Sequence, residues 1–273
     1  MFDKRSPKFL DGFLRPGAVL CLVLLAVLAV RPAMGEEDNA RSVEIEKMSA
    51  KQILDYIDDL FRGDSSYAKI SMKVMTEHWS RELMLEAWSE GTDKTLVRIL
   101  SPRKERGTAT LKAGNDIWNY LPKVRRLIKL PSSMMGGSWM GSHFTNDDLV
   151  KDSRMAEDYD FAITFRGERD GVKVTEATCI PKEEAAVVWG KVVVRIRDRD
   201  VMPLLIQYYS EDMKLSREMQ FSDFRLMGGR VVPALCRMVP KDKPKESTEV
   251  FYEEIDFNPK LDPDIFSLRR LQQ

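Results

Sequence analysis

The sequence predicts a mainly β protein with few helices, in which short antiparallel strands form one curved sheet. Along most of the chain, apolar and polar side chains alternate with a period of two, as in strands that have one dry face. Glycine-containing turns separate these runs, and no helical stretch suited to connecting parallel strands lies between them. A sheet of about a dozen strands rarely stays flat. We therefore expect a barrel or half-barrel whose concave side is filled or encloses a ligand.

One amphipathic helix is expected before the strands. Ser49 and Gln52 have the spacing of a capping box at the start of a helix, and Gly63 stands where a helix commonly ends. Between them apolar residues recur at helical spacing, among them Ile57 and Phe61. We expect this helix to cover part of the concave side of the sheet with its apolar face.

The alternation is clearest from Tyr67 to Met75, where Ile70, Met72 and Val74 share one face of the expected strand. Turn pairs at Glu90-Gly91, Gly114-Asn115, Asp170-Gly171 and Gly228-Gly229 separate several of the runs. The expected strands are Tyr67–Met75, Glu82–Trp88, Thr95–Leu100, Thr108–Ala113, Asp116–Leu121, Arg126–Leu130, Tyr159–Arg166, Val172–Ile180, Val188–Arg197, Leu204–Ser210, Met213–Arg225, Val231–Val239 and Glu249–Phe257.

The stretch 131–148 interrupts the alternation. It places methionines and the aromatic residues Trp139 and Phe144 among Gly136, Gly137 and Gly141. Methionine is flexible and polarizable, so such a stretch is suited to adaptable apolar contact. Two interpretations remain open: a plug that fills the barrel, or a mobile lid or docking loop. Both place these side chains over the concave face.

The first 35 residues have the features of an export signal. Basic residues precede Gly17–Val30, an apolar run shorter than the roughly 20 residues that a bilayer-spanning helix needs. Ala33 and Gly35 then provide small residues for cleavage after Gly35. We expect residues 1–35 to be a signal peptide and residues 36–273 to form a single domain in the periplasm. An uncleaved N-terminal anchor is the alternative.

Charge and motifs argue against several classes of function. The chain has 43 Lys+Arg and 43 Asp+Glu, so it lacks the positive excess that binds a nucleic-acid backbone. With 2 His, little material exists for a histidine-rich metal site or an acid/base pair. No nucleophile elbow, zinc-protease motif, phosphate loop or dinucleotide fingerprint is present. We predict no enzymatic activity, no cofactor and no nucleic-acid partner.

For two other groups of residues, the cysteines and a cluster of aspartates, the sequence allows both a specific role and an ordinary structural one. Cys179 and Cys236 follow the leader and either form a disulfide in an oxidising compartment or serve as small buried apolar side chains. Asp147, Asp148 and Asp152 lack the ligand spacing of a calcium loop, and capping of a short helix is the other explanation. We predict no metal site.

Several segments in combination point to a known family. They are Phe61–Tyr67, Arg98–Pro102, Gly107–Leu111, Ile117–Arg126 and Met134–Ser142 with Phe144–Leu149. These segments resemble the bacterial outer membrane lipoprotein-sorting proteins of the LolA-like superfamily, and the resemblance extends from about Ile53 to the C-terminus. One departure is His143, where an acidic residue is expected, and it concerns a local loop contact.

The resemblance implies both a fold and a function. The fold is an unclosed β-barrel, or half-barrel, with helix and loop over its concave apolar face. The implied function is that of a periplasmic carrier, which binds lipid or the acyl chains of lipoproteins and transfers them to or from the outer membrane. An RND/MMPL-type inner-membrane transporter is the implied partner, and we expect a monomer. A periplasmic lipid-sensing regulatory protein of similar fold is the alternative.

A carrier must enclose its cargo, because each CH₂ group exposed to water costs about 0.8 kcal/mol. For any single apolar residue, however, a place in the ordinary core is the competing explanation. The residues expected to line the cavity or its cover are Ile57, Phe61, Ile70, Met72, Val74, Leu83, Leu85, Trp118, Met134, Met135, Trp139, Met140 and Phe144, and Val192, Val194 and Ile196 are expected to face inward as well.

Positive charge is concentrated at Lys123, Arg125, Arg126 and Lys129. These residues are candidates for contact with anionic headgroups or with an acidic patch on a partner. A solvated strand face is the alternative explanation.

Overall fold

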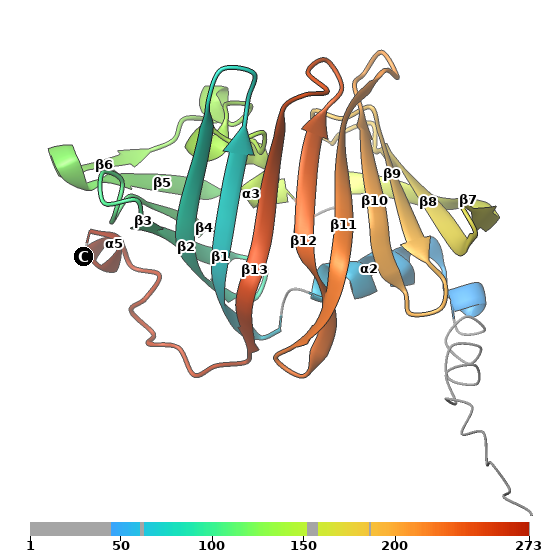
Figure 1. Cartoon of the computed structure of the whole chain (residues 1–273), viewed down its shortest axis with the longest axis horizontal. Helices are drawn as coiled ribbons and strands as arrows, with labels where there is room; N and C mark the ends of the chain where they lie inside the picture. The colour runs from blue at the N-terminus through green and yellow to red at the C-terminus, as the bar shows by residue number, and fades with distance from the viewer. Residues whose placement is uncertain (1–44, 61–62, 152–157, 186, 273) are drawn as a thin grey trace, which may run out of the picture. The chain divides into compact units, whose positions relative to one another are not determined.

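A computed structural model describes residues 45–60, 63–151, 158–185 and 187–272 of the chain. Within these residues the strands form one 13-stranded antiparallel sheet in the order β6-β5-β4-β3-β2-β1-β13-β12-β11-β10-β9-β8-β7 (Figure 1). The strands are β1 (Ser65–Met75), β2 (Ser80–Glu90), β3 (Lys94–Ser101), β4 (Ala109–Ala113), β5 (Asp116–Leu121), β6 (Arg126–Lys129), β7 (Tyr159–Arg169), β8 (Val172–Pro181), β9 (Lys191–Arg197), β10 (Met202–Tyr209), β11 (Leu215–Met227), β12 (Arg230–Pro240) and β13 (Ser247–Phe257).

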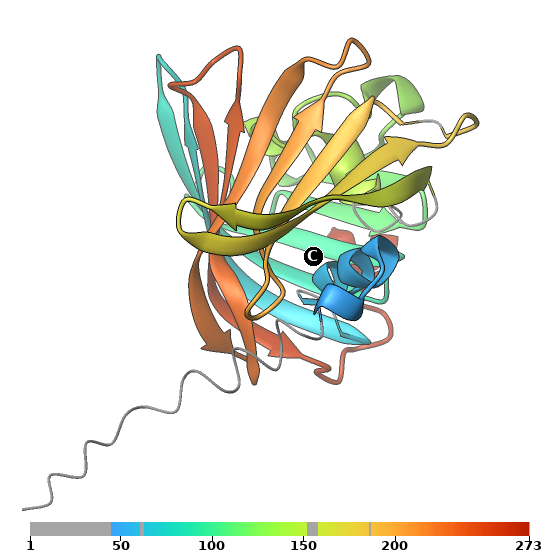
Figure 2. The same ribbon diagram turned by 90° about the vertical axis from the view of Figure 1, so that its right-hand side faces the viewer.

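The remaining elements are short helices. They are α2 (Ala50–Leu60), α3 (Asn146–Lys151) and α5 (Leu268–Leu271), with 3₁₀ turns η1 (Pro122–Val124), η2 (Ser132–Met134) and η3 (Trp139–Gly141). Figure 2 shows that the sheet is strongly curved and that α2 lies on its concave side. Since β6 and β7 are the two edges of the described sheet, the barrel is not closed. The predicted fold class, a curved antiparallel sheet forming a half-barrel, is confirmed.

At the middle of the sheet the first strand, β1, pairs with the last, β13, so that Ser66 lies opposite Phe257. Strands adjacent in the sequence are neighbours in the described sheet, except β6 and β7, which stand at its two edges. The segment between them, which contains η2, η3 and α3, therefore runs from one edge of the half-barrel to the other.

The capping box predicted for α2 is present. The Ser49 backbone N–H donates to Gln52 Oε1 (2.9 Å), and the Gln52 backbone N–H donates to Ser49 Oγ (3.3 Å). Ile53 and Ile57 are buried and belong to the same apolar cluster as Val194 of β9. The helix thus covers the β7–β12 half of the concave face. Residues 61–62, including Phe61, lie outside the described residues.

The two faces of the sheet near β3 are covered by different segments. Val97 and Ile99 point to the concave side, whereas Leu96 joins an apolar cluster with Ile265 and Leu271 of the C-terminal segment. Trp118 packs against this second cluster. The prediction that Trp118 faces the cavity is therefore wrong: it lies on the outer face, because its neighbour Ile117 is the residue of β5 that points inward and the pleat sends Trp118 the other way.

Both cysteines of the described strands are free thiols rather than a disulfide. Cys179 on β8 and Cys236 on β12 belong to the apolar cluster of the concave face. Burial raises the pKa of each thiol to about 12. Of the two interpretations left open by the sequence, the structure therefore agrees with the second: both cysteines serve as small buried apolar side chains.

The predicted signal peptide, residues 1–35, and the cleavage position after Gly35 lie outside the described residues. Of the helices that the structure describes, none combines the length and the hydrophobicity that crossing a bilayer requires.

Candidate functional site

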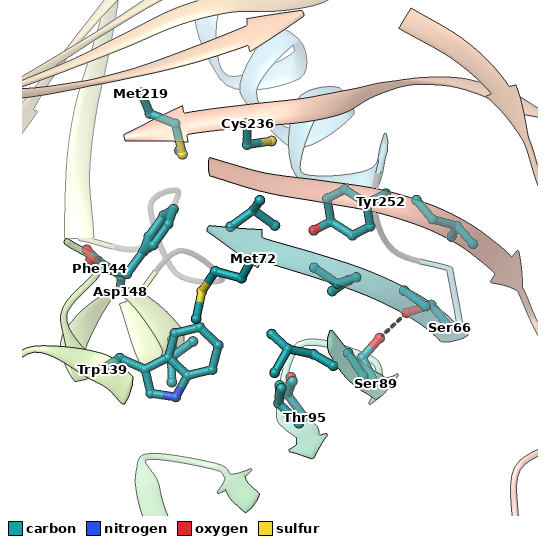
Figure 3. Close-up of a pocket in the computed structure, with 18 of the residues that line it drawn as sticks. Ser66, Met72, Ser89, Thr95, Trp139, Phe144, Asp148, Met219, Cys236 and Tyr252 are labelled. Atoms are coloured by element: carbon teal, nitrogen blue, oxygen red, sulfur yellow. Dashed lines mark hydrogen bonds between the residues drawn. The ribbon is translucent and has the colours of Figure 1, made fainter. Parts of the chain in front are cut away.

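A pocket of about 340 Å³ lies in the concave side of the half-barrel (Figure 3). Its size is within the range of about 300–1,000 Å³ that is usual for small-molecule sites. Side chains from α2, from β1 to β3, from β10 to β13 and from the segment between β6 and β7 line it. Most of these side chains are apolar. The pocket is thus bounded by the sheet on one side and by helix and loop on the other.

One wall comes from the first strands of the sheet. Ala68, Ile70 and Met72 alternate along β1 and point into the pocket, and Leu85 and Ala87 of β2 extend this wall. The opposite wall comes from the last strands, because the pairing of β1 with β13 brings them alongside. Its residues are Ile206, Tyr208, Met219, Phe221, Cys236, Val250, Tyr252 and Ile255.

Two aromatic side chains of the segment between β6 and β7 cover the pocket. The Trp139 backbone N–H donates to the Phe144 carbonyl (2.8 Å), which holds the two residues together. The Trp139 side chain is buried, and its Nε1 donates to Thr110 Oγ1 (3.2 Å). Since the polar group of the indole is paired, the ring can form an apolar wall without leaving an unsatisfied donor. Trp139 and Phe144 lie at the same end of the pocket in Figure 3.

The cover is fastened to the sheet on both sides. On β2, Arg81 Nη1 donates to the Met140 carbonyl (2.7 Å). Beside β13, the His143 ring lies between Thr248 Oγ1 (2.8 Å from Nδ1) and Glu246 Oε2 (3.1 Å from Nε2). The hydrogen bond with His143 is the main reason that the pKa of Glu246 is lowered. The departure at His143 thus has a structural role in holding the cover.

A buried ion pair makes a third attachment. Asp148 of α3 accepts from Arg217 Nη2 (2.5 Å) and Nη1 (2.9 Å), and only 6% and 9% of the Arg217 and Asp148 side chains are exposed. The Arg217 guanidinium also lies 4.5 Å from the Trp189 ring and 4.6 Å from the Tyr208 ring. Charge pairing and aromatic contact together fix α3 against β11 across the pocket.

Asp148 is also part of the cap at the start of α3. Its backbone N–H donates to Thr145 Oγ1 (3.2 Å), and its Oδ2 accepts from the Thr145 backbone N–H (2.7 Å). Asp152 lies outside the described residues. Among the residues that are described, no group of three or more His, Cys, Asp or Glu side chains is arranged to hold a metal ion.

A row of hydroxyl groups marks the other end of the pocket. Ser66, Ser89 and Thr95 are cross-strand partners on β1, β2 and β3, and all three line the pocket. Ser66 Oγ and Ser89 Oγ are 2.5 Å apart, as the dashed line in Figure 3 marks. The charged side chains among the described lining residues are Asp58 and Asp148. The site therefore offers apolar contact and uncharged hydrogen bonds.

Comparison with known proteins gives a family and a fold. The model of a family described as "Uncharacterized protein" matches residues 91–273, about two thirds of the chain. The chain belongs to this family. No curated protein matches the sequence.

Three crystal structures have the same LolA-like fold. An outer membrane lipoprotein-sorting protein domain from Vibrio parahaemolyticus is 22% identical, with a TM-score of 0.70 over 82% of this chain and 97% of that one. A LolA superfamily protein from Nitrosomonas europaea is 21% identical, with a TM-score of 0.69 over 82% of this chain and 99% of that one. A DUF1329 family protein from Desulfovibrio piger is 18% identical, with a TM-score of 0.72 over 81% of this chain and 97% of that one.

The LolA-like sheet brings some of the predicted cavity residues together and separates others. Lining the pocket are Ile57, Ile70, Met72, Leu85, Trp139 and Phe144. Val74, Leu83, Val192, Val194 and Ile196 are buried in the core without lining it. Met134 is 55% exposed, and Met135 and Met140 are partly buried outside the pocket. The cover of the pocket is thus aromatic, and its methionines lie around it.

Sequence reasoning missed the wall from β10 to β13. The signal was present in part, since Met219 and Phe221 alternate along the expected strand Met213–Arg225. Nothing local indicated that this strand would lie near β1, because that depends on the pairing of the first strand with the last.

The four predicted basic residues lie on the hairpin of β5 and β6, away from the pocket. Lys123, Arg125 and Arg126 are exposed. Lys129 forms an ion pair with Asp116 (2.6 Å). The hairpin stands at one edge of the LolA-like sheet.

Proposed function

We propose that the chain is a non-enzymatic carrier that holds the acyl chain of a lipid or of a lipid-modified protein between the sheet and its cover. The pocket carries this proposal, because it is lined mainly by apolar side chains and is closed on one side by Trp139 and Phe144. The names of two proteins with the same fold, a lipoprotein-sorting domain and a LolA superfamily protein, support it.

The chemistry of the walls favours an acyl chain inside and a charged headgroup outside. Each buried CH₂ group gains about 0.8 kcal/mol, so apolar walls stabilise a hydrocarbon chain. An anionic group would gain nothing from Asp58 or Asp148, the charged residues of the described lining. The hydroxyl row of Ser66, Ser89 and Thr95 offers hydrogen bonds to an ester or hydroxyl group at that end.

The proposed carrier works in the periplasm after loss of residues 1–35 and transfers its cargo to or from the outer membrane. The apolar leader that ends at Gly35 supports export. An RND/MMPL-type inner-membrane transporter is the proposed partner, on the strength of the family resemblance of the sequence segments.

Native mass spectrometry of the exported protein tests the cargo. We expect a bound lipid mass, and we expect the emptied protein to raise the fluorescence of N-phenyl-1-naphthylamine, an uncharged apolar probe. Ala87→Phe adds a ring inside the pocket and should reduce both signals several-fold, whereas Met134→Phe adds the same ring on the exposed surface of the cover and should not. A protein without lipid and without probe uptake would overturn the proposal.

A vesicle experiment separates carrying from sensing. A carrier accelerates movement of a pyrene-labelled phospholipid from donor to acceptor vesicles in proportion to its concentration. A protein that binds the probe but leaves the transfer rate unchanged is a sensor or a storage protein, and this result would contradict the carrier function.

A further inference from the structure

The hairpin of β5, η1 and β6 exposes apolar side chains at the edge of the sheet. Leu121 is 38% exposed, Val124 60% and Ile128 40%. Single exposed apolar residues are ordinary on protein surfaces. Here three of them lie within one short hairpin, close to its turn. None of the three lines the pocket.

Basic side chains stand between these apolar ones. Lys123, Arg125 and Arg126 are exposed, and none of the three forms an ion pair with another described residue. Lys129 is different, because Asp116 neutralises it at 2.6 Å. The turn of the hairpin thus carries three positive charges and no negative one.

The backbone conformation at the turn is unusual for a basic residue. Arg125 has φ 50° and ψ 39°, in the left-handed region, and its backbone N–H donates to the Pro122 carbonyl. Glycine adopts this conformation readily, whereas a side chain with a β-carbon makes it costly. A glycine at this position would adopt the left-handed conformation at lower cost. The arginine instead places a positive charge next to Val124.

We propose that this hairpin docks the protein on a membrane surface that contains anionic phospholipids. Side chains such as Val124 fit the boundary between headgroups and acyl chains, and neighbouring Lys and Arg side chains contact phosphates. Pairing with the same hairpin of a second copy is disfavoured, because it would bring equal positive charges together. A surface that is only acidic would pair the charges but leave Leu121, Val124 and Ile128 in water.

Flotation with phospholipid vesicles tests this docking on residues 36–273. We expect binding to vesicles of phosphatidylglycerol and phosphatidylcholine in a 30:70 ratio, and little binding to pure phosphatidylcholine. Binding should weaken steeply as the salt concentration rises, because the Debye length falls from about 10 Å at 0.1 M to about 3 Å at 1 M.

Variants of the turn locate the contact. Each of Lys123→Gln and Arg126→Gln should lower the partition coefficient about five-fold, as expected for one basic residue near an anionic surface. Arg125→Gly should do the same while suiting the left-handed backbone, so its loss of binding is not a folding defect. Lys214→Gln, which removes one charge from the exposed turn between β10 and β11, is the matched control and should bind as before.

The triple variant of Lys123, Arg125 and Arg126 should lose vesicle binding yet keep probe uptake by the pocket. This separates the docking from the cargo function. Equal binding to both kinds of vesicle, no binding to either, or a triple variant that binds like Lys214→Gln would overturn the proposal.

Discussion

The pair of Asp148 and Arg217 predicts a large loss of stability from a single change of charge. Asp148→Asn keeps the size of the side chain and an oxygen that can accept from the Thr145 backbone N–H. It removes the negative charge beside a guanidinium that is 6% exposed. The arginine then keeps its contacts with the Trp189 and Tyr208 rings but loses the carboxylate charge that both of its Nη atoms contact.

The magnitude follows from this burial. Breaking a buried ion pair by removing one partner costs about 3–5 kcal/mol. Urea unfolding of a chain of this size has a slope of about 3 kcal/mol per molar, at the upper end of the range for small proteins. The urea midpoint of Asp148→Asn should therefore fall by about 1 to 1.7 M. Tryptophan fluorescence measures it, since Trp139 and Trp189 lie near the pair.

Two control variants test whether the buried pair has this effect. Asp55→Asn breaks an exposed pair with Lys51, whose side chain is 59% exposed, and should cost less than about 0.5 kcal/mol. The double variant Asp148→Asn with Arg217→Met removes both charges, and it should be more stable than the sum of the two single losses predicts. A midpoint for Asp148→Asn equal to that of Asp55→Asn, or strict additivity in the double variant, would show that the buried pair does not hold α3.

Other changes have equally defined outcomes. The hydrogen bond with His143 lowers the pKa of Glu246, so this carboxylate contributes stability that is full above its ordinary pKa of 4.5 and is lost as the pH falls through the lowered value. Glu246→Gln should reduce the urea midpoint at pH 7 and flatten its pH dependence below 4.5. Because burial raises the pKa of Cys179 and Cys236 to about 12, iodoacetamide at pH 8 should label the native thiols far more slowly than the urea-unfolded ones, as read by peptide mass spectrometry. Ser49→Ala should cost about 1 kcal/mol in urea unfolding, and Ser49→Asp, which keeps a cap, should cost much less.

Most of the sheet could be predicted from the sequence, because each strand has its own pattern. The period of two along Tyr67–Met75 depends only on which side of that strand is dry, and β1 buries Ile70, Met72 and Val74 as expected. The antiparallel arrangement followed from the tight turns. Those features are local, so local reasoning was sufficient for them.

The composition of the pocket was harder, because it depends on contacts between distant parts of the chain. Ile117 and Trp118 are both apolar, and Trp118 packs on the outer face against a cluster that contains residues of the distant C-terminal segment. The wall that contains Met219 and Phe221 reaches β1 only through β13. Neither contact leaves a periodic signal in the sequence.

For the cover of the pocket, too, the sequence predicted the kind of contact but not which residues make it. Its composition indicated apolar contact with the concave face, and Trp139 and Phe144 make that contact. Met140 has φ 49°, in the left-handed region, at the turn that separates these two aromatic residues. The backbone thus turns in η3 between two aromatic residues that line the pocket, while Met134 of the preceding η2 is exposed. Turn geometry of this kind could not be read from residue types.

Because β1 pairs with β13, the sheet cannot form completely until the C-terminal strand is available. Ser66 pairs with Phe257, so one edge of β1 stays unpaired until nearly the whole chain is present. Contacts so distant in sequence form slowly, and an open strand edge can pair with other chains in the meantime. A chain truncated before residue 247 would leave that edge exposed permanently. We therefore expect such fragments to aggregate or be degraded, even though they retain most of the sheet.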